Sequence, residues 1–182
     1  MLESVFKSRH DALDISFAHC HAENTRAALV IVHGMAEHKE RDYPFMEFLA
    51  RNGIASVIED HRGHGKSIRS SADLGYFGEN GADGLLDDIH QLTEYAKMKY
   101  PDTPLFMLGH SMGAMAVRTF IQKHGDMLDG LIVSGNPGYN GSAKMGVEMA
   151  RRAQQKKGSH ARCRMLSIGM FAPFILGSRK FY

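Results

Sequence analysis

The sequence contains only two cysteines, Cys20 and Cys163, and they lie far apart in the chain. Two separated thiols form no disulfide framework, so a reducing cytoplasm is the simpler expectation. Residues 1–4 are polar and lack the apolar core of a secretory signal, which supports the same expectation. The longest apolar-leaning stretch, residues 165–177, is shorter than the roughly 20 residues of a membrane-spanning helix. We therefore expect a cytoplasmic protein without a transmembrane segment.

Acidic residues are nearly absent from the last part of the chain. Residues 144–180 contain nine Lys and Arg but one acid, Glu148, so this segment carries +8 while the whole chain carries +2. Residues 1–143 therefore carry about −6. Two interpretations stay open: a solvated helical surface, or a surface that contacts anionic lipid headgroups. Nucleic acid is not an expected partner, since no recognised nucleic-acid-binding module occurs in the segment.

Neither a metal centre nor a nucleotide site is expected, and no cofactor is predicted. Gly65-Lys66-Ser67 resembles the end of a phosphate-binding P-loop, but that pattern requires glycine at position 60, where Asp60 stands. His19-Cys20-His21 places two histidines on one face of a strand, but no further ligand cluster lies nearby in the sequence. We interpret this segment as part of a solvated hairpin at a sheet edge.

Hydrophobic runs alternate with helical patterns along the first 140 residues. Strands are predicted at residues 5–9, 14–20, 28–32, 54–59, 105–108 and 130–134, and helices at residues 44–51, 84–99 and 112–124. This alternation predicts an α/β fold, in which a mostly parallel sheet carries helices on both faces and a site at the carboxyl ends of its strands. Beyond residue 138 the pattern changes to helices at residues 143–157 and 162–171. The helix at residues 143–157 carries methionines on one side. They are compatible with packing on the sheet or with a flexible surface that binds an acyl chain.

A serine stands between a predicted strand and a predicted helix, in Gly109-His110-Ser111-Met112-Gly113. This G-x-S-x-G pattern is the nucleophile elbow, in which a strained turn holds the serine hydroxyl clear of the backbone. The glycines let neighbouring backbone pass close, and the helix N-terminus favours developing negative charge. The pattern predicts that Ser111 is a nucleophile for acyl transfer.

The strand at residues 28–32 runs into His33-Gly34-Met35-Ala36-Glu37-His38. An acyl-transfer serine needs N–H donors that bind the oxyanion of the tetrahedral intermediate. One donor belongs to the residue after the nucleophile, here Met112, and the other comes from a loop after an earlier strand, here Met35. The alternative for His33-Gly34 is a strand end with a flexible turn.

Three motifs follow one another along the chain: His33-Gly34-Met35-Ala36-Glu37-His38, Asp60-His61-Arg62-Gly63-His64-Gly65-Lys66-Ser67 and Gly109-His110-Ser111-Met112-Gly113. In order and spacing they resemble the monoacylglycerol lipase and lysophospholipase branch of the α/β-hydrolase superfamily, over about residues 10–140. The resemblance implies an incomplete α/β-hydrolase core at residues 1–140 and the start of a helical cap or lid at residues 141–182. It also implies hydrolysis of a small-molecule carboxylic ester or lysolipid through a Ser111 acyl-enzyme.

The same resemblance implies roles for individual residues. Ser111 is the nucleophile, and the backbone N–H groups of Met35 and Met112 form the oxyanion hole. The supporting residues are Gly34, Gly109, His110 and Gly113. The loop at residues 60–67 is mainly structural in that family.

No acid or base of a Ser–His–Asp triad is assigned. In this fold the chain order is serine, then Asp or Glu, then histidine, and the sequence stops 71 residues after Ser111. We expect both residues to lie beyond the given chain, which would then be a fragment with little activity of its own. Among the histidines present, His124 and His160 are the first alternatives as a base.

Two other functions stay open. One is a shortened, non-catalytic homologue that binds a lipid or a protein partner. The other is a peroxidase or C–C hydrolase on the same fold, because a fold does not fix the reaction.

Overall fold

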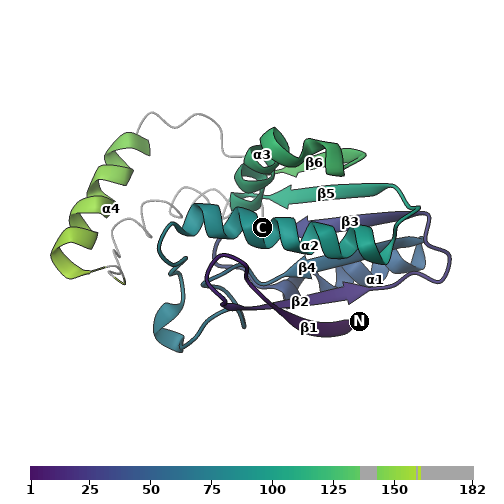
Figure 1. The fold of residues 1–182 in the computed structure, drawn as a ribbon, viewed down its shortest axis with the longest axis horizontal. Coiled ribbons are helices and arrows are strands. Elements are labelled where there is room, and N and C mark those ends of the chain that lie inside the picture. The colour runs from purple at the N-terminus through teal and green to yellow at the C-terminus, as the bar shows by residue number, and fades with distance from the viewer. Residues whose placement is uncertain (136–142, 159, 161–182) are drawn as a thin grey trace, which may run out of the picture. The chain divides into compact units, whose positions relative to one another are not determined.

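The computed structural model describes residues 1–135, 143–158 and 160. The chain divides into two compact units, Met1–Pro137 and Gly138–Tyr182. The first unit contains a sheet with its helices, and the second contains helix α4, Ala143–Lys157 (Figure 1). The helix predicted at residues 162–171 lies outside the described residues.

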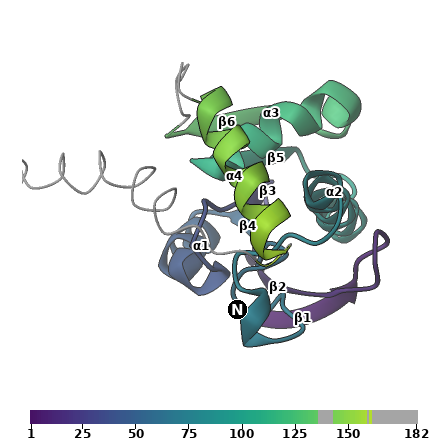
Figure 2. The same ribbon diagram turned by 90° about the vertical axis from the view of Figure 1, so that its left-hand side faces the viewer.

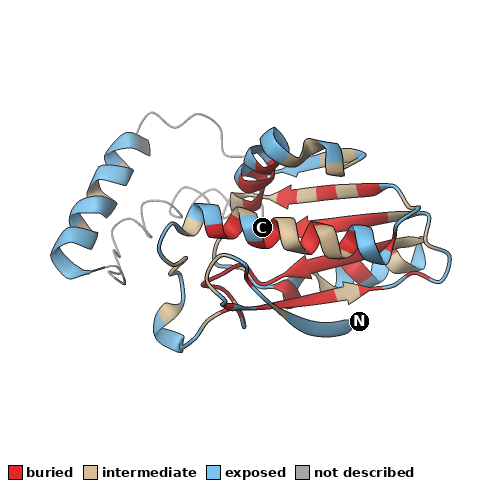
Figure 3. Cartoon of the chain, in the orientation of Figure 1, coloured by how far each residue is buried: buried red, intermediate tan, exposed pale blue. Residues whose placement is uncertain are grey.

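Six strands of the first unit form one sheet in the order β1-β2-β4-β3-β5-β6. Strands β4, β3, β5 and β6 run parallel, and the β1–β2 hairpin joins β4 antiparallel. The central strands β3 and β4 are almost wholly buried, as strands covered on both faces are (Figure 3). The predicted α/β class with a mostly parallel sheet is confirmed. The strand bounds are β1 Leu2–Lys7, β2 Asp14–Cys20, β3 Ala27–Val32, β4 Ile54–Glu59, β5 Leu105–His110 and β6 Gly130–Ser134.

Helices cover both faces of the sheet (Figure 2). Helix α1 packs on one face, and α2 and α3 pack on the other. Because successive side chains of a strand point to opposite faces, β3 serves both cores: Leu29 and Ile31 pack with α1, and Val30 and Val32 pack with α2 and α3. The helix bounds are α1 Tyr43–Arg51, α2 Gly81–Lys99 and α3 Met112–His124, with short 3₁₀ turns at Lys39–Asp42, Ser71–Asp73 and Gly125–Met127.

The predicted elements differ from the observed ones mainly at their ends. The first strand spans Leu2–Lys7 rather than residues 5–9, because the chain turns at Ser8, whose N–H donates to the carbonyl of Leu13. Helix α2 begins at Gly81, three residues before the predicted start. Strand β5 continues to His110, since it pairs with β6 as far as Ser134.

Strand β6 is the last strand of the sheet among the described residues. It pairs with β5 alone, and Ile132 and Val133 are 48% and 40% exposed. Its second edge therefore presents backbone N–H and C=O groups beside an apolar surface. Within the described part of the chain, no helix has the length and apolar character needed to cross a bilayer.

Candidate active site

Ser111 occupies the turn between β5 and α3. Its backbone angles, φ 53° and ψ −112°, lie where residues other than glycine are seldom found. The turn is anchored to the sheet, because the Ser111 N–H donates to the carbonyl oxygen of Ser134 at 2.9 Å. Ser111 thus stands on a strained strand-to-helix turn at the carboxyl end of β5, which is the local geometry that a nucleophile elbow requires.

The glycines on either side of Ser111 permit this turn. A Cβ added at Gly113 would lie 2.0 Å from the carbonyl oxygen of Val32 in β3. A Cβ at Gly109 would lie 2.5 Å from the carbonyl oxygen of Gly113. Since backbone atoms cannot move aside as the end of a flexible side chain can, both positions are restricted to glycine, and α3 starts directly against β3.

The loop after β3 reaches the nucleophile turn. A Cβ added at Gly34 would come within 3.2 Å of the Ser111 Cβ. The Gly34 N–H donates to Glu37 Oε2 at 2.8 Å, and the Arg41 guanidinium binds the other Glu37 oxygen. Glu37 therefore closes the loop onto itself beside Ser111, which a freely flexible turn would not do.

Two backbone N–H groups at this junction, those of Met35 and Met112, have no hydrogen-bond acceptor among the described residues. Met112 is the first residue of α3, and the first N–H groups of a helix have no intrahelical partner. Both N–H groups are therefore available to an oxygen of a ligand. Their convergence on one point near the Ser111 hydroxyl stays a prediction.

His33 orients the peptide that carries the Met35 N–H. Its Nδ1 donates to the Gly34 carbonyl oxygen at 2.8 Å, and its Nε2 accepts the His61 N–H at 3.1 Å. Because a peptide is planar and trans, a fixed Gly34 carbonyl also fixes the direction of the Met35 N–H. The two bonds require a neutral ring, and burial lowers the pKa of His33 to about 4.

His61 lies under His33, with the ring centroids 3.7 Å apart. Its Nε2 donates to the His33 carbonyl oxygen at 3.0 Å, and its Nδ1 lies 3.3 Å from Glu59 Oε1. Burial lowers the pKa of His61 well below its ordinary value, and burial raises the pKa of Glu59 well above its own. Burial thus favours the neutral form of both groups across the 3.3 Å contact between Glu59 and His61.

Asp60 fastens the loop after β3 to the loop after β4. Its carboxylate accepts the backbone N–H groups of Lys39 and Lys66, at 2.8 and 2.9 Å, and the buried Lys39 ammonium at 2.8 Å. A Cβ added at Gly65 would lie 2.2 Å from the carboxyl carbon of Asp60. The protein's own carboxylate thus fills the turn that resembled a P-loop.

A pocket of about 250 Å³ opens at the carboxyl ends of β3, β5 and β6, on the side of α1. Both polar and apolar residues line it, and burial together with the nearby Glu37 carboxylate raises the pKa of Asp42. The lining residues are Ile31, His33, Glu37, Arg41, Asp42, Phe45, Leu108, His110 and Ser134. The His110 side chain therefore faces this pocket from the residue before Ser111.

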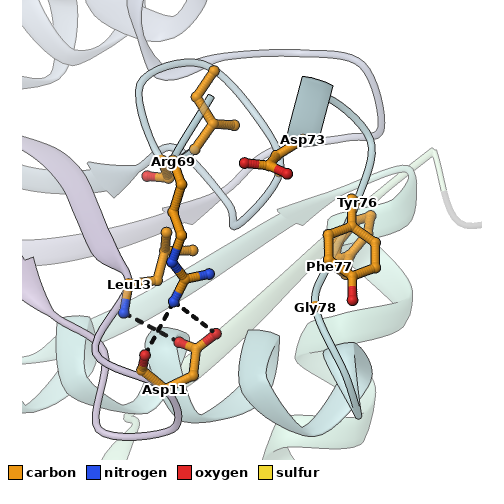
Figure 4. A pocket seen from close by; sticks show the side chains of 10 residues that line it. Asp11, Leu13, Arg69, Asp73, Tyr76, Phe77 and Gly78 are labelled. Carbon is orange, nitrogen blue, oxygen red and sulfur yellow. Dashed lines mark hydrogen bonds and ion pairs between the residues drawn. The ribbon is translucent and has the colours of Figure 1, made fainter. Parts of the chain in front are cut away.

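A second pocket, of about 20 Å³, has room for a water molecule but not for a substrate. Figure 4 shows the Arg69 side chain reaching Asp11 at its wall. Behind it the buried Arg62 guanidinium binds Asp88 at 2.8 Å and Asp11 at 3.2 Å. This cluster ties the β1–β2 connection to α2 and has a structural role.

The structure provides no base for Ser111 among the described core residues, because no described side chain hydrogen-bonds the Ser111 hydroxyl. His124, one of the two proposed alternatives, is excluded by its position. It is the last residue of the 13-residue helix α3 that follows Ser111, about 20 Å away along the axis, and its ring stacks on His90 at 4.2 Å. His160 belongs to the second unit, and its role as a base stays untested.

The histidines of the β2 segment pack on α2 rather than facing only solvent. His19 Nδ1 lies 2.9 Å from the Tyr95 hydroxyl, and the His21 ring stacks on Tyr100 at 6.0 Å. Cys20, between them, is buried against the α1 face. The predicted hairpin at the sheet edge is present, but the description of it as solvated was wrong for His19, which is half-buried.

Sequence reasoning missed the residues that brace the loop after β3, namely Glu37, Asp60 and His64. Their position in the sequence could have indicated them, because each is a polar residue in a loop that follows a strand predicted to be buried. A polar side chain there needs a partner within the same edge of the sheet.

The fold and the turn at Ser111 together define an α/β-hydrolase. The chain belongs to the family described as "Serine aminopeptidase, S33", which matches residues 23–166. A monoglyceride lipase homolog of Monkeypox virus is 36% identical over 89 residues, covering 49% of this chain and 30% of the relative. Lysophospholipase L2 of Escherichia coli K12 is 26% identical over 154 residues, covering 85% of this chain and 45% of the relative.

A solved structure extends the likeness to three dimensions. The highly thermostable carboxyl esterase from Bacillus coagulans, in complex with glycerol, superposes with a TM-score of 0.77 at 29% identity. The match covers 85% of this chain and 50% of the esterase. The chain therefore spans half or less of the length of these relatives.

Proposed function

We propose that this chain is the nucleophile-bearing part of a serine ester hydrolase that acts on lysophospholipids or monoacylglycerols. The observation that carries the proposal is the placement of Ser111 on a strained turn between β5 and α3, next to Gly34 and near two N–H groups that have no acceptor in the described part of the chain. The names of the relatives, a lipase homolog, a lysophospholipase and a carboxyl esterase, support an ester as the substrate.

In the proposed reaction the Ser111 oxygen attacks the ester carbonyl carbon and loses its proton. The carbonyl oxygen becomes an oxyanion, which the Met35 and Met112 N–H groups bind. The C–O bond to the alcohol then breaks, the alcohol takes up a proton, and an acyl ester of Ser111 remains. Water hydrolyses that ester, which releases the carboxylic acid and restores the serine hydroxyl.

The proton acceptor in the first step is not assigned. None of the described core side chains hydrogen-bonds the Ser111 hydroxyl. An oxyanion hole without a base accelerates the reaction by only about 10³–10⁴-fold over the uncatalysed rate. We therefore expect low turnover from the 182-residue chain alone.

A fluorophosphonate probe tests the proposal, because it phosphonylates a nucleophilic serine that lies beside an oxyanion hole. Labelling of Ser111, absent in Ser111→Ala, together with Ser111-dependent release of fatty acid from lysophospholipid or monoacylglycerol, would support it. Cleavage of an aminoacyl amide in preference to either ester would instead point to the peptidase activity in the family's description.

A second candidate is a homologue that binds a lipid or a protein without hydrolysis. The absence of a hydrogen bond to the Ser111 hydroxyl within the described ranges favours it. Lysolipid binding that Ser111→Ala leaves unchanged, in a protein that no fluorophosphonate labels, would select this candidate.

We further propose that the second unit contacts anionic lipid. Helix α4 contains five basic residues and one acid, with Glu148 paired to Arg152 at 2.9 Å. Binding to vesicles with anionic lipid should weaken as salt rises, since exposed charges are screened within about 10 Å at 0.1 M. Equal binding to neutral vesicles would leave a solvated helix. The cap assignment for residues 141–182 and the cytoplasmic location stay predictions.

A further inference from the structure

The loop after β4 supplies a hydrogen bond to the oxyanion loop that the proposed chemistry has not used. His64 Nε2 accepts the Ala36 N–H at 3.1 Å, and His64 Nδ1 donates to the Arg62 carbonyl oxygen at 3.2 Å. Because Nδ1 must donate and Nε2 must accept, the ring is neutral with its proton on Nδ1. The edge of the Phe77 ring packs on it at 5.3 Å and His64 is buried, so the ring has one orientation.

Ala36 is the residue that needs this bond. Its φ of 60° lies in the left-handed region, which is unfavourable for an L-residue other than glycine. The Ala36 N–H belongs to the peptide that follows Met35, and His33 already holds the peptide that precedes Met35 through the Gly34 carbonyl. The peptides on both sides of Met35 are therefore held by a histidine: His33 binds the preceding one and His64 the following one.

We propose that His64 is a positioning residue of the oxyanion hole, which fixes the direction of the Met35 N–H by holding the next peptide of the loop. This inference rests on the proposed function, in which that N–H binds the oxyanion. It joins the second sequence motif to the chemistry of Ser111, although the two are 47 residues apart in the chain. His64 itself touches no substrate.

The substitutions His64→Gln and His64→Ala separate the hydrogen bond from the ring. The Gln amide oxygen can reach the place of Nε2 and accept the Ala36 N–H, whereas Ala removes the acceptor. His19→Ala is the control, because it removes a half-buried histidine of the β1–β2 hairpin that hydrogen-bonds Tyr95, away from the loop after β3. Each variant is studied in the full chain, with its melting temperature recorded.

Two readouts are measured: hydrogen exchange of the Ala36 amide, and phosphonylation of Ser111 split into probe binding and covalent reaction. In His64→Ala we expect Ala36 to exchange at least about tenfold faster and the covalent rate to fall about 10-fold to 10²-fold, approaching the loss of one oxyanion donor. Probe binding should stay unchanged. His64→Gln and His19→Ala should match the wild type in both readouts.

Three results would overturn the proposal: unchanged Ala36 exchange in His64→Ala, an unchanged covalent rate in that variant, or a rate loss in His64→Gln equal to that of His64→Ala. The last would assign the effect to ring packing. Because no base is assigned, labelling should be slow; if the wild type is not labelled even after prolonged reaction with excess probe, the proposed function fails, and the exchange readout alone decides whether His64 holds the loop.

The exchange of the Ala36 amide at acid pH gives a second test, which compares the wild type with His64→Gln and does not need His64→Ala. Burial lowers the pKa of His64, while its bond to the Arg62 carbonyl and the Asp60 carboxylate oppose that shift. The rings of His33, His61 and Phe77 also face it. Once Nε2 is protonated it cannot accept the Ala36 N–H. As the pH falls below the ordinary pKa of a histidine, the wild type should lose Ala36 protection before His64→Gln does, and equal loss in both would refute the hydrogen bond.

Discussion

Replacement of His33 by glutamine should change how the stability of the first unit depends on pH. Burial, aided by the nearby His64, lowers the pKa of His33 from 6.5 to about 4, although its bond to the Gly34 carbonyl and the charges of Asp60 and Glu37 oppose the shift. Between these two values the unfolded chain binds a proton at His33 that the folded chain does not bind. The free energy of unfolding therefore falls as the pH falls through this window.

The size of the effect follows from the width of the window. One pKa unit corresponds to 1.36 kcal/mol. A pKa lowered to about 4 therefore means that the free energy of unfolding is about 3 kcal/mol higher when His33 is neutral in both the folded and the unfolded chain than when it is protonated in both. This contribution is fully present above pH 6.5 and is lost progressively by about pH 4.

Other groups act on the same pH range, and the comparison is designed to remove them. The pKa of Glu59 is raised by burial, so the stability it contributes is present at low pH and is lost as the pH rises above the ordinary value of a carboxyl group. His61, whose pKa is lowered, acts in the same direction as His33. Both groups are present in the wild type and in His33→Gln, and their effects largely cancel in the difference.

Urea unfolding at intervals from pH 7.5 to pH 4 measures this difference. His33→Gln keeps an acceptor for the His61 N–H and a donor for the Gly34 carbonyl, so the variant should fold. The wild type should lose about 3 kcal/mol more than the variant across the range. Thr93→Val, which removes a buried hydroxyl and no titratable group, is the control and should lose as much as the wild type. Parallel curves for the wild type and His33→Gln would refute the assignment of a neutral buried His33.

Three further predictions concern other parts of the first unit. Gly113→Ala should destabilise the protein by about 3 kcal/mol or more, because its Cβ would meet the Val32 carbonyl, whereas Gly146→Ala in α4, with open space around the Cβ, should not lower the melting temperature. Lys39→Met should cost about 3–5 kcal/mol in urea unfolding, since it leaves the buried Asp60 carboxylate without its cation; a change below about 1 kcal/mol would show that backbone N–H groups suffice. Ile132→Lys should reduce self-association measured by sedimentation, because a charge protects an exposed strand edge; unchanged association would exclude β6 as the contact.

The strands, the helices and the strand-to-helix turn at Ser111 could be predicted because their signals are local. The run Leu105–Leu108 followed by Gly109 and Gly113 needs no knowledge of distant residues, and the structure places Ser111 between β5 and α3, whereas its role as a nucleophile stays a prediction. Ends of elements were less accurate. The strand β1 starts at Leu2 because it pairs with β2, and the exposed residues of β1 carry no alternation that would reveal its start.

The braces of the oxyanion loop could not be predicted in the same way. The bond between Ala36 and His64 joins residues 28 positions apart, and so does the bond between His33 and His61. Such pairs depend on which strands are neighbours in the sheet. The order of the strands cannot be predicted from a local sequence pattern. His124 shows the converse error, because its distance from Ser111 is a property of the helix between them and could have been estimated from the sequence.

The order of the strands explains why two distant motifs meet at Ser111. Strand β3 lies between β4 and β5 and runs parallel to both, so the three loops that follow these strands emerge side by side at one edge of the sheet. The middle loop carries Met35, the loop after β5 carries Ser111, and the loop after β4 carries His64. The middle loop can therefore touch Ser111 on one side while it is held by His64 and Asp60 on the other. In the function proposed above, a loop so held would keep the Met35 N–H in place before a substrate arrives, because an oxyanion hole is effective to the extent that its donors are fixed in advance.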